Sequence, residues 1–120
     1  MKILVIDDDA AVRKFISLIL QRKKHTVVEA YNGVNGLQLL QEHPDIAVMI
    51  TDLIMPEKEG IETIIEVRQQ YPSIKILAIS GGGKVSPENY LVIADALGAH
   101  TTLKKPFSGQ ELIQAIENLL

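Results

Sequence analysis

Short apolar runs alternate with segments of helical periodicity along the whole of this 120-residue chain, and this alternation constrains the fold more than any other feature. The apolar runs, predicted as strands, cover residues 3–6, 26–30, 46–51, 74–79 and 101–103. Most of them are apolar on both faces, as expected of parallel strands with helices on both sides of the sheet. The repeated strand–helix pairs, joined by right-handed crossovers, predict an α/β fold with a doubly wound, five-stranded parallel sheet.

The segments between these runs carry apolar side chains at the three- and four-residue spacing of amphipathic helices. They fall into five groups: Val12, Phe15, Ile16, Ile19 and Leu20; Val34, Leu37 and Leu40; Ile61, Ile64 and Ile65; Tyr90, Leu91, Ala94 and Leu97; and Leu112, Ile113, Ile116 and Leu119. Asp9 is placed to cap the first helix, and Gly98 to end the fourth. Ser108 and Glu111 have the spacing of a capping box at the start of the last helix.

Length and composition indicate one ordinary globular domain spanning residues 1–120. A chain of this length buries roughly two-thirds of its unfolded surface, so it needs no disulfide or structural zinc to fold. It contains no cysteine, and its net charge of −3 argues against direct binding to nucleic acid. The short apolar run after Met1-Lys2 is too brief for a signal peptide or a membrane span. We therefore expect a soluble, cytoplasmic protein.

Polar side chains lie at the ends of four of the five predicted strands. Asp7 and Asp8 follow the first strand, Asp52 the third and Ser80 the fourth, and Lys105 lies just beyond the fifth. In a doubly wound sheet the functional site lies at the carboxyl ends of the strands, where the strand order reverses. Each residue alone has a structural interpretation as a turn residue, a helix cap or a solvated side chain. Because they occur together at this edge, we interpret them as a functional site.

The charges at this edge indicate a particular chemistry. Asp7, Asp8 and Asp52 repel one another, and at ~4 Å each like-charged pair costs ~1 kcal/mol in water and several times more in a partly buried site. Mg²⁺ would offset the repulsion, because it favours a few carboxylates together with waters and phosphate oxygens. Lys105 supplies a second compensating charge, and the Ser80 hydroxyl can donate to an anionic oxygen. This combination suits phosphoryl transfer to an aspartate nucleophile.

In order and spacing, these residues resemble the receiver domain of two-component response regulators, over essentially the whole chain. The resemblance rests on residues 3–9, which end in Asp7-Asp8-Asp9, on Thr51-Asp52 with Met55-Pro56 and Gly60, on Ser80, and on Lys105-Pro106-Phe107. It implies a flavodoxin-like three-layer sandwich with strand order 2-1-3-4-5. It also implies a signalling switch rather than an enzyme.

The resemblance implies a role for each residue of the site. Asp52 would be the phosphoacceptor, taking a phosphoryl group from a sensor histidine kinase or a phosphotransfer protein. Asp8 would bind Mg²⁺ directly together with Asp52 and the backbone carbonyl of Ile54. Asp7 would support the same ion through water, and Lys105 would pair with the phosphoryl oxygens.

The resemblance also implies how the signal leaves the site. Ser80 would move to form a hydrogen bond with the phosphoryl group, and this movement would start the output. The aromatic residue that the family usually has three positions before the lysine is Thr102 here, so the usual aromatic relay is missing. The chain would be a monomer or a phosphorylation-dependent dimer, and a downstream target or the second copy would bind the face formed by the fourth helix, fifth strand and fifth helix. That face would include Asn89, Tyr90, Ile93, Thr102 and Gln110.

The apolar Ile54 side chain cannot position a water molecule to attack the phosphoryl group. This predicts that the phosphoryl group on Asp52 is long-lived.

The main alternative is a small phosphatase of the haloacid-dehalogenase type, with Asp7 and Asp9 as its Asp-x-Asp motif. The chain is short for that fold, has no acidic pair after Lys105 and would leave Asp52 unexplained. A nucleotide- or flavin-binding module is disfavoured, because no glycine-rich phosphate loop follows the first predicted strand. A receiver that is never phosphorylated is disfavoured, because all five site positions carry the expected residues.

Met1 directly before the first strand and the end at Leu120 favour a stand-alone regulator.

Overall fold

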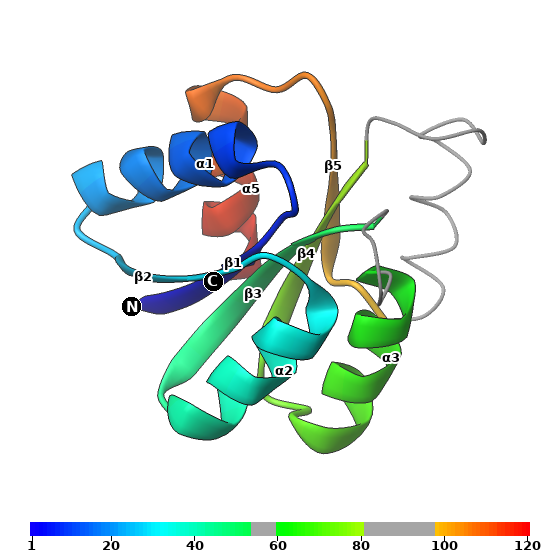
Figure 1. Cartoon of the computed structure of the whole chain (residues 1–120). Coiled ribbons are helices and arrows are strands. Elements are labelled where there is room, and N and C mark those ends of the chain that lie inside the picture. Colours follow the sequence, from blue (N-terminus) through cyan, green and yellow to red (C-terminus); the bar gives the residue numbers. More distant parts are fainter. Residues whose placement is uncertain (54–59, 81–97) are drawn as a thin grey trace.

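Five parallel strands form one sheet in the computed structural model of the chain, which describes residues 1–53, 60–80 and 98–120 (Figure 1). The strands are β1 (Lys2–Ile6), β2 (Thr26–Ala30), β3 (Ile46–Asp52), β4 (Lys75–Ser80) and β5 (Thr101–Lys104). They lie in the order β2-β1-β3-β4-β5, and every neighbouring pair is parallel. The prediction of a doubly wound sheet with this strand order is confirmed.

Helices cover both faces of the sheet, which gives the molecule three layers (Figure 1). On one face lie α1 (Ala10–Arg22) and α5 (Gly109–Leu119), which contact each other. On the other face lie α2 (Gly33–Glu42) and α3 (Gly60–Gln70), which also contact each other. The residues of the expected fourth helix, 90–97, lie outside the described residues. None of the described helices has the length and apolar character that crossing a membrane requires.

Each face of the sheet packs into its own hydrophobic cluster, because successive side chains of a strand point to opposite faces. On β1, Leu4 and Ile6 belong to the cluster under α2 and α3, whereas Ile3 and Val5 belong to the cluster under α1 and α5. β1, β3 and β4 are almost entirely buried, while β2 at the edge is partly exposed. The central position of the first, third and fourth strands therefore explains why their sequences are apolar on both faces.

Side-chain caps fix where the first and last helices begin. Asp9 Oδ1 accepts a hydrogen bond of 2.9 Å from the amide of Ala11 at the start of α1. Ser108 and Glu111 form a reciprocal capping box at the start of α5. Both caps were predicted from the sequence and are confirmed. Only three residues, Asp7, Asp8 and the cap Asp9, separate the end of β1 from the start of α1, so this loop is short.

Three strands, β3, β4 and β5, end one residue later than the sequence predicts. Asp52 still pairs with Ile79 in the ladder between β3 and β4, and Ser80 pairs with Lys104 in the ladder between β4 and β5. Neighbouring strands therefore hold the backbones of Asp52 and Ser80. Both residues are strand residues at the end of the sheet, not loop residues that follow it.

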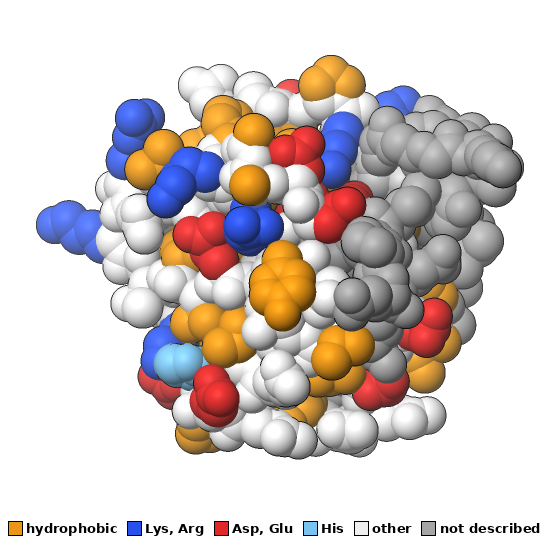
Figure 2. Space-filling model, in the orientation of Figure 1, with side chains coloured by type: hydrophobic (Ala, Val, Ile, Leu, Met, Phe, Trp, Pro, Cys, Tyr) orange, Lys and Arg blue, Asp and Glu red, His pale blue; other side chains and the backbone are white. Residues whose placement is uncertain are grey.

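The surface mixes side chains of different kinds. Figure 2 shows one face on which acidic and basic side chains are intermixed and hydrophobic side chains are scattered between them. One exposed hydrophobic residue is Phe15 of α1, which is 43% exposed and whose ring centroid lies 6.1 Å from that of Phe107. The helical spacing groups Phe15 with Ile16 and Leu20, which are buried. The apolar stripe of α1 is therefore wider than its sheet-facing side, because Phe15 packs against the segment that follows β5.

Candidate functional site

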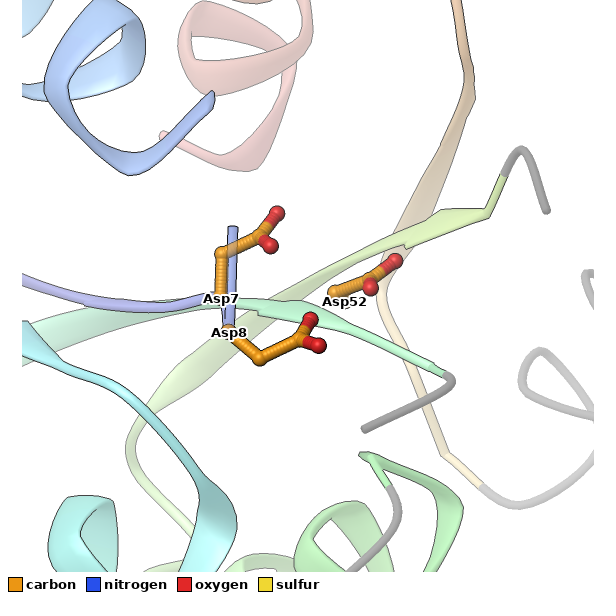
Figure 3. A group of neighbouring side chains, drawn as sticks. All are labelled: Asp7, Asp8 and Asp52. Carbon is orange, nitrogen blue, oxygen red and sulfur yellow. The ribbon is translucent and has the colours of Figure 1, made fainter. Parts of the chain in front are cut away.

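The carboxylates of Asp7, Asp8 and Asp52 lie together at the carboxyl ends of β1 and β3 (Figure 3). Asp7 and Asp8 directly follow β1, and Asp52 is the last residue of β3. One oxygen of each carboxylate lies within 4.8 Å of the corresponding oxygens of the other two. β1 and β3 are neighbours at the point where the strand order reverses. The structure therefore brings these residues together where the topology predicts a site.

Asp7 is held in place by its surroundings. Its side chain is buried, and its Oδ1 accepts a hydrogen bond of 2.9 Å from the amide of Asp9. Its own amide donates to the carbonyl of Ala30 on β2 at 3.2 Å. Burial raises the pKa of Asp7, while the hydrogen bond from Asp9 and the charge of Lys105 oppose that rise. Asp7 is thus a fixed, buried acid, and Asp8 beside it is exposed.

Lys105 brings one positive charge to the three carboxyl groups. Its backbone amide donates to the carbonyl of Ser80 at 2.8 Å, which aligns the residue with the end of β4. Its Nζ lies 3.4 Å from Asp7 Oδ2 and 3.5 Å from Asp52 Oδ1. Burial alone would lower the pKa of Lys105, but the charges of Asp52 and Asp7 outweigh burial and raise it. The ammonium group is therefore charged and shared between two carboxylates, as its place after the fifth strand predicts.

Asp52 resists ionisation more strongly than an ordinary aspartate. It is only 8% exposed, and burial raises its pKa from 3.8 to about 6. The charge of Lys105 lowers this pKa, whereas the charges of Asp7 and Asp8 raise it. At neutral pH Asp52 is still ionised, so a nucleophilic carboxylate is available in a partly desolvated place.

Gly60, the first residue of α3, packs directly on the backbone of Asp52. Its amide donates to the carbonyl of Leu53 at 3.0 Å. A Cβ atom at position 60 would lie 2.1 Å from the carbonyl oxygen of Asp52 and 2.7 Å from Leu53 Cα. No side chain fits there without moving the backbone of β3, so Gly60 allows α3 to begin immediately beside Asp52.

Ser80 ends β4, next to the strand that carries Asp52. It is 1% exposed, and its hydroxyl has no hydrogen-bond partner among the described residues. A buried hydroxyl without a hydrogen-bond partner lowers folding stability by about 1–3 kcal/mol. An acceptor placed beside the Ser80 hydroxyl would therefore be bound favourably. The sequence prediction that Ser80 lies at the same edge as the aspartates is confirmed.

The donor set of this edge fits Mg²⁺. Three carboxylates supply the hard oxygen ligands that Mg²⁺ prefers, and a single ammonium group does not balance their charge. Burial raises the pKa values of Asp7 and Asp52, so a divalent cation between them would stabilise their ionised forms. The fourth expected ligand, the carbonyl of Ile54, lies outside the described residues.

Sequence reasoning missed one pair of residues beside the site. The Nη1 atom of Arg13 on α1 donates to the backbone carbonyl of Asp7 at 2.7 Å, and its Nε donates to Glu29 Oε1 on β2 at 3.0 Å. The only signal in the sequence was that Arg13 lies four residues after the cap Asp9, one helical turn along the same face. That spacing does not reveal a contact with a backbone carbonyl or with a second strand.

Comparison with known proteins gives a consistent match over nearly the whole chain. The family described as "Response regulator receiver domain" matches residues 3–117. The chemotaxis protein CheY homolog of Campylobacter jejuni is 36% identical over 124 residues, which cover 100% of this chain and 92% of that protein. The transcriptional regulatory protein CpxR of Escherichia coli is 31% identical over 99% of this chain, which spans 49% of that protein.

Solved structures agree with these matches. The chemotaxis protein CheY4 of Vibrio cholerae superposes with a TM-score of 0.87 at 31% identity, covering 99% of this chain and 98% of that one. A response regulator receiver domain protein from Clostridium thermocellum superposes with a TM-score of 0.89, also at 31% identity, covering 98% of this chain and 92% of that one. Together with the matched family, these relatives show that the chain belongs to the receiver domains of two-component response regulators.

Proposed function

We propose that the chain accepts a phosphoryl group on Asp52 from a sensor histidine kinase or a phosphotransfer protein, in a reaction that requires Mg²⁺. One observation carries the proposal. A buried carboxylate with a raised pKa lies 3.5 Å from the ammonium of Lys105 and in one cluster with Asp7 and Asp8. Membership of the receiver family supports the same assignment of roles.

The transfer would exchange one bond to phosphorus for another. A carboxylate oxygen of Asp52 attacks the phosphorus of the donor phosphohistidine, the P–N bond breaks, and the imidazole leaves with the electron pair. With a pKa of about 6, Asp52 is ionised at neutral pH and needs no general base. The Lys105 ammonium neutralises charge on the phosphoryl oxygens. Mg²⁺ held by Asp8 and Asp52, with Asp7 in support, would supply further neutralising charge.

Ser80 would connect the phosphoryl group to the partner-binding face. Its buried hydroxyl can donate to a phosphoryl oxygen, and its backbone pairs with Lys104 on β5, so a movement of Ser80 acts directly on that strand. Beside β5 a groove of about 440 Å³ runs along α5, and its lining includes Thr102 and Gln110. The remaining residues of the expected face, Asn89, Tyr90 and Ile93, lie outside the described residues, as does Ile54, on which the phosphoryl lifetime depends.

The phosphatase alternative receives no support from Asp9. In a haloacid-dehalogenase-type enzyme this residue would serve as the second aspartate of the motif. Here Asp9 Oδ1 accepts hydrogen bonds from the amides of Ala11 and Val12 at 2.9 and 3.3 Å, as an ordinary helix cap. Lys105 pairs with Asp52 as well as with Asp7, and the phosphatase alternative gives Asp52 no role.

The proposal is tested by incubating the protein with Mg²⁺ and acetyl phosphate and measuring the intact mass. We expect one phosphoryl group per chain, and none in Asp52→Asn or after addition of EDTA. Asp45→Asn is a matched control, since it makes the same chemical change at an exposed aspartate that pairs with Lys2 at the other end of β1.

Two results would contradict the proposal. A phosphoryl adduct that persists in Asp52→Asn would show that another residue is the acceptor. Rapid release of inorganic phosphate that is lost in Asp7→Asn but retained in Asp52→Asn would indicate a phosphatase.

A further inference from the structure

We propose that Arg13, held by Glu29, is a positioning residue for divalent-cation binding at the acidic cluster; the inference rests on the function proposed above. Arg13 lies in the first turn of α1, and its Nη1 donates to the backbone carbonyl of Asp7 at 2.7 Å. Its Nε donates to Glu29 Oε1 on β2 at 3.0 Å. One guanidinium group thus ties the end of β1, the start of α1 and the neighbouring strand together.

The carbonyl that Arg13 holds belongs to the peptide group joining Asp7 to Asp8. The Asp7 side chain has its own anchors, the amide of Asp9 at 2.9 Å and Lys105 Nζ at 3.4 Å. The exposed Asp8 carboxylate has no hydrogen bond or ion pair with any other residue that the structure describes. Among the described residues, only the backbone directs the Asp8 side chain, and Arg13 holds the peptide immediately before it. Without Arg13, Asp8 would lose its alignment with Asp52.

Glu29 balances the positive charge that Arg13 brings next to the acidic cluster. A guanidinium presents several N–H donors in a rigid fork, so one group can hold a carbonyl and a carboxylate at once. An unbalanced positive charge next to the cluster would compete with a cation for the carboxylates. Glu29 neutralises Arg13 at 3.0 Å, and the two side chains are only 21% and 34% exposed, so water does not fully screen the pair. The pair therefore orients the loop while the cluster keeps its negative charge.

The test is the Mg²⁺ dissociation constant of the full chain, measured by isothermal titration calorimetry. We expect Arg13→Met to weaken Mg²⁺ binding roughly tenfold, in the range observed when an outer-shell partner of a metal ligand is removed. Glu29→Gln keeps an acceptor for Arg13 but removes its charge, so it should give a smaller loss in the same direction. Arg68→Met is the matched control, because Arg68 Nη1 on α3 also donates to a backbone carbonyl, that of Pro72 at 3.1 Å, away from the cluster.

A second measurement separates positioning from a general loss of structure. With acetyl phosphate as donor, Arg13→Met should label slowly at limiting Mg²⁺ and recover the wild-type rate at saturating Mg²⁺. In EDTA, Arg13→Met and its control Arg68→Met should unfold at similar urea concentrations.

The outcomes separate a failure of the proposed function from a failure of this inference alone. Wild-type protein that binds no Mg²⁺ would overturn the proposed function, and this inference with it. Wild-type protein that binds Mg²⁺ while Arg13→Met and Glu29→Gln bind it equally well would overturn this inference alone. A labelling rate in Arg13→Met that saturating Mg²⁺ does not restore would also overturn it, because the defect would then lie beyond cation binding.

Discussion

Replacing Asp52 by asparagine should stabilise the metal-free protein at neutral pH, because it removes a carboxylate that is ionised at the expense of folding stability. Burial raises the pKa of Asp52 from 3.8 to about 6. Each pKa unit corresponds to about 1.4 kcal/mol, so ionised Asp52 lowers the free energy of unfolding by about 3 kcal/mol. Asparagine has the same shape and no charge, and we expect Asp52→Asn to recover much of this amount above pH 7.

The sign of the effect follows from proton binding. Between pH 4 and pH 6 the folded chain keeps the Asp52 proton while the unfolded chain has lost it, so stability falls as pH rises through this window. Below pH 4 both states are protonated at this position, and the wild type and Asp52→Asn should have similar stability. The difference in the free energy of unfolding between the wild type and Asp52→Asn should therefore grow from pH 4 to pH 6 and stay constant above pH 6.

Urea unfolding followed by circular dichroism, in EDTA and at several pH values, measures this difference. Asp8→Asn is the matched control, since it removes the same charge from the same cluster at an exposed position and should stabilise the protein much less. Added Mg²⁺ should stabilise the wild type in proportion to its occupancy and stabilise Asp52→Asn far less. A stability gain that is absent at pH 7.5, or that is equally large at pH 4, would refute the reasoning.

Three further outcomes follow from contacts at the site. Gly60→Ala should lower the free energy of unfolding by about 1–3 kcal/mol and slow phosphorylation, because its Cβ would lie 2.1 Å from the Asp52 carbonyl oxygen; urea unfolding and mass measurement check this. Ser80→Ala should raise the melting temperature of the unphosphorylated protein by removing a buried hydroxyl without a described partner, yet abolish the amide chemical-shift changes on β5 after phosphorylation. Asp9→Ala should cost about 1 kcal/mol through loss of the α1 cap, whereas Asp9→Asn should cost little.

Most of the site could be predicted from the sequence because topology determines which strand ends meet. Apolar runs separated by helical segments indicate parallel strands, and parallel strands have their carboxyl ends at the same edge. Asp8, Asp52, Ser80 and Lys105 each come at such an end, so their meeting required no knowledge of side-chain packing. The helix caps at Asp9 and Ser108 could also be predicted, because a cap depends only on residues within one helical turn of each other in the sequence.

Other features depend on distances between segments that are remote in the sequence, and only the tertiary structure decides them. Glu29 reaches Arg13 from β2, and the same arginine holds the Asp7 carbonyl because the first turn of α1 packs against the end of β1. The raised pKa of Asp52 comes first from burial, which follows from the packing of the strands and of α3 around it. Periodicity and strand order are properties of the covalent chain, whereas desolvation and contacts between side chains and remote backbone groups arise only when the layers pack. The sequence by itself therefore determined which strand-end residues form the candidate site, and the packed structure decided how those residues are held and charged.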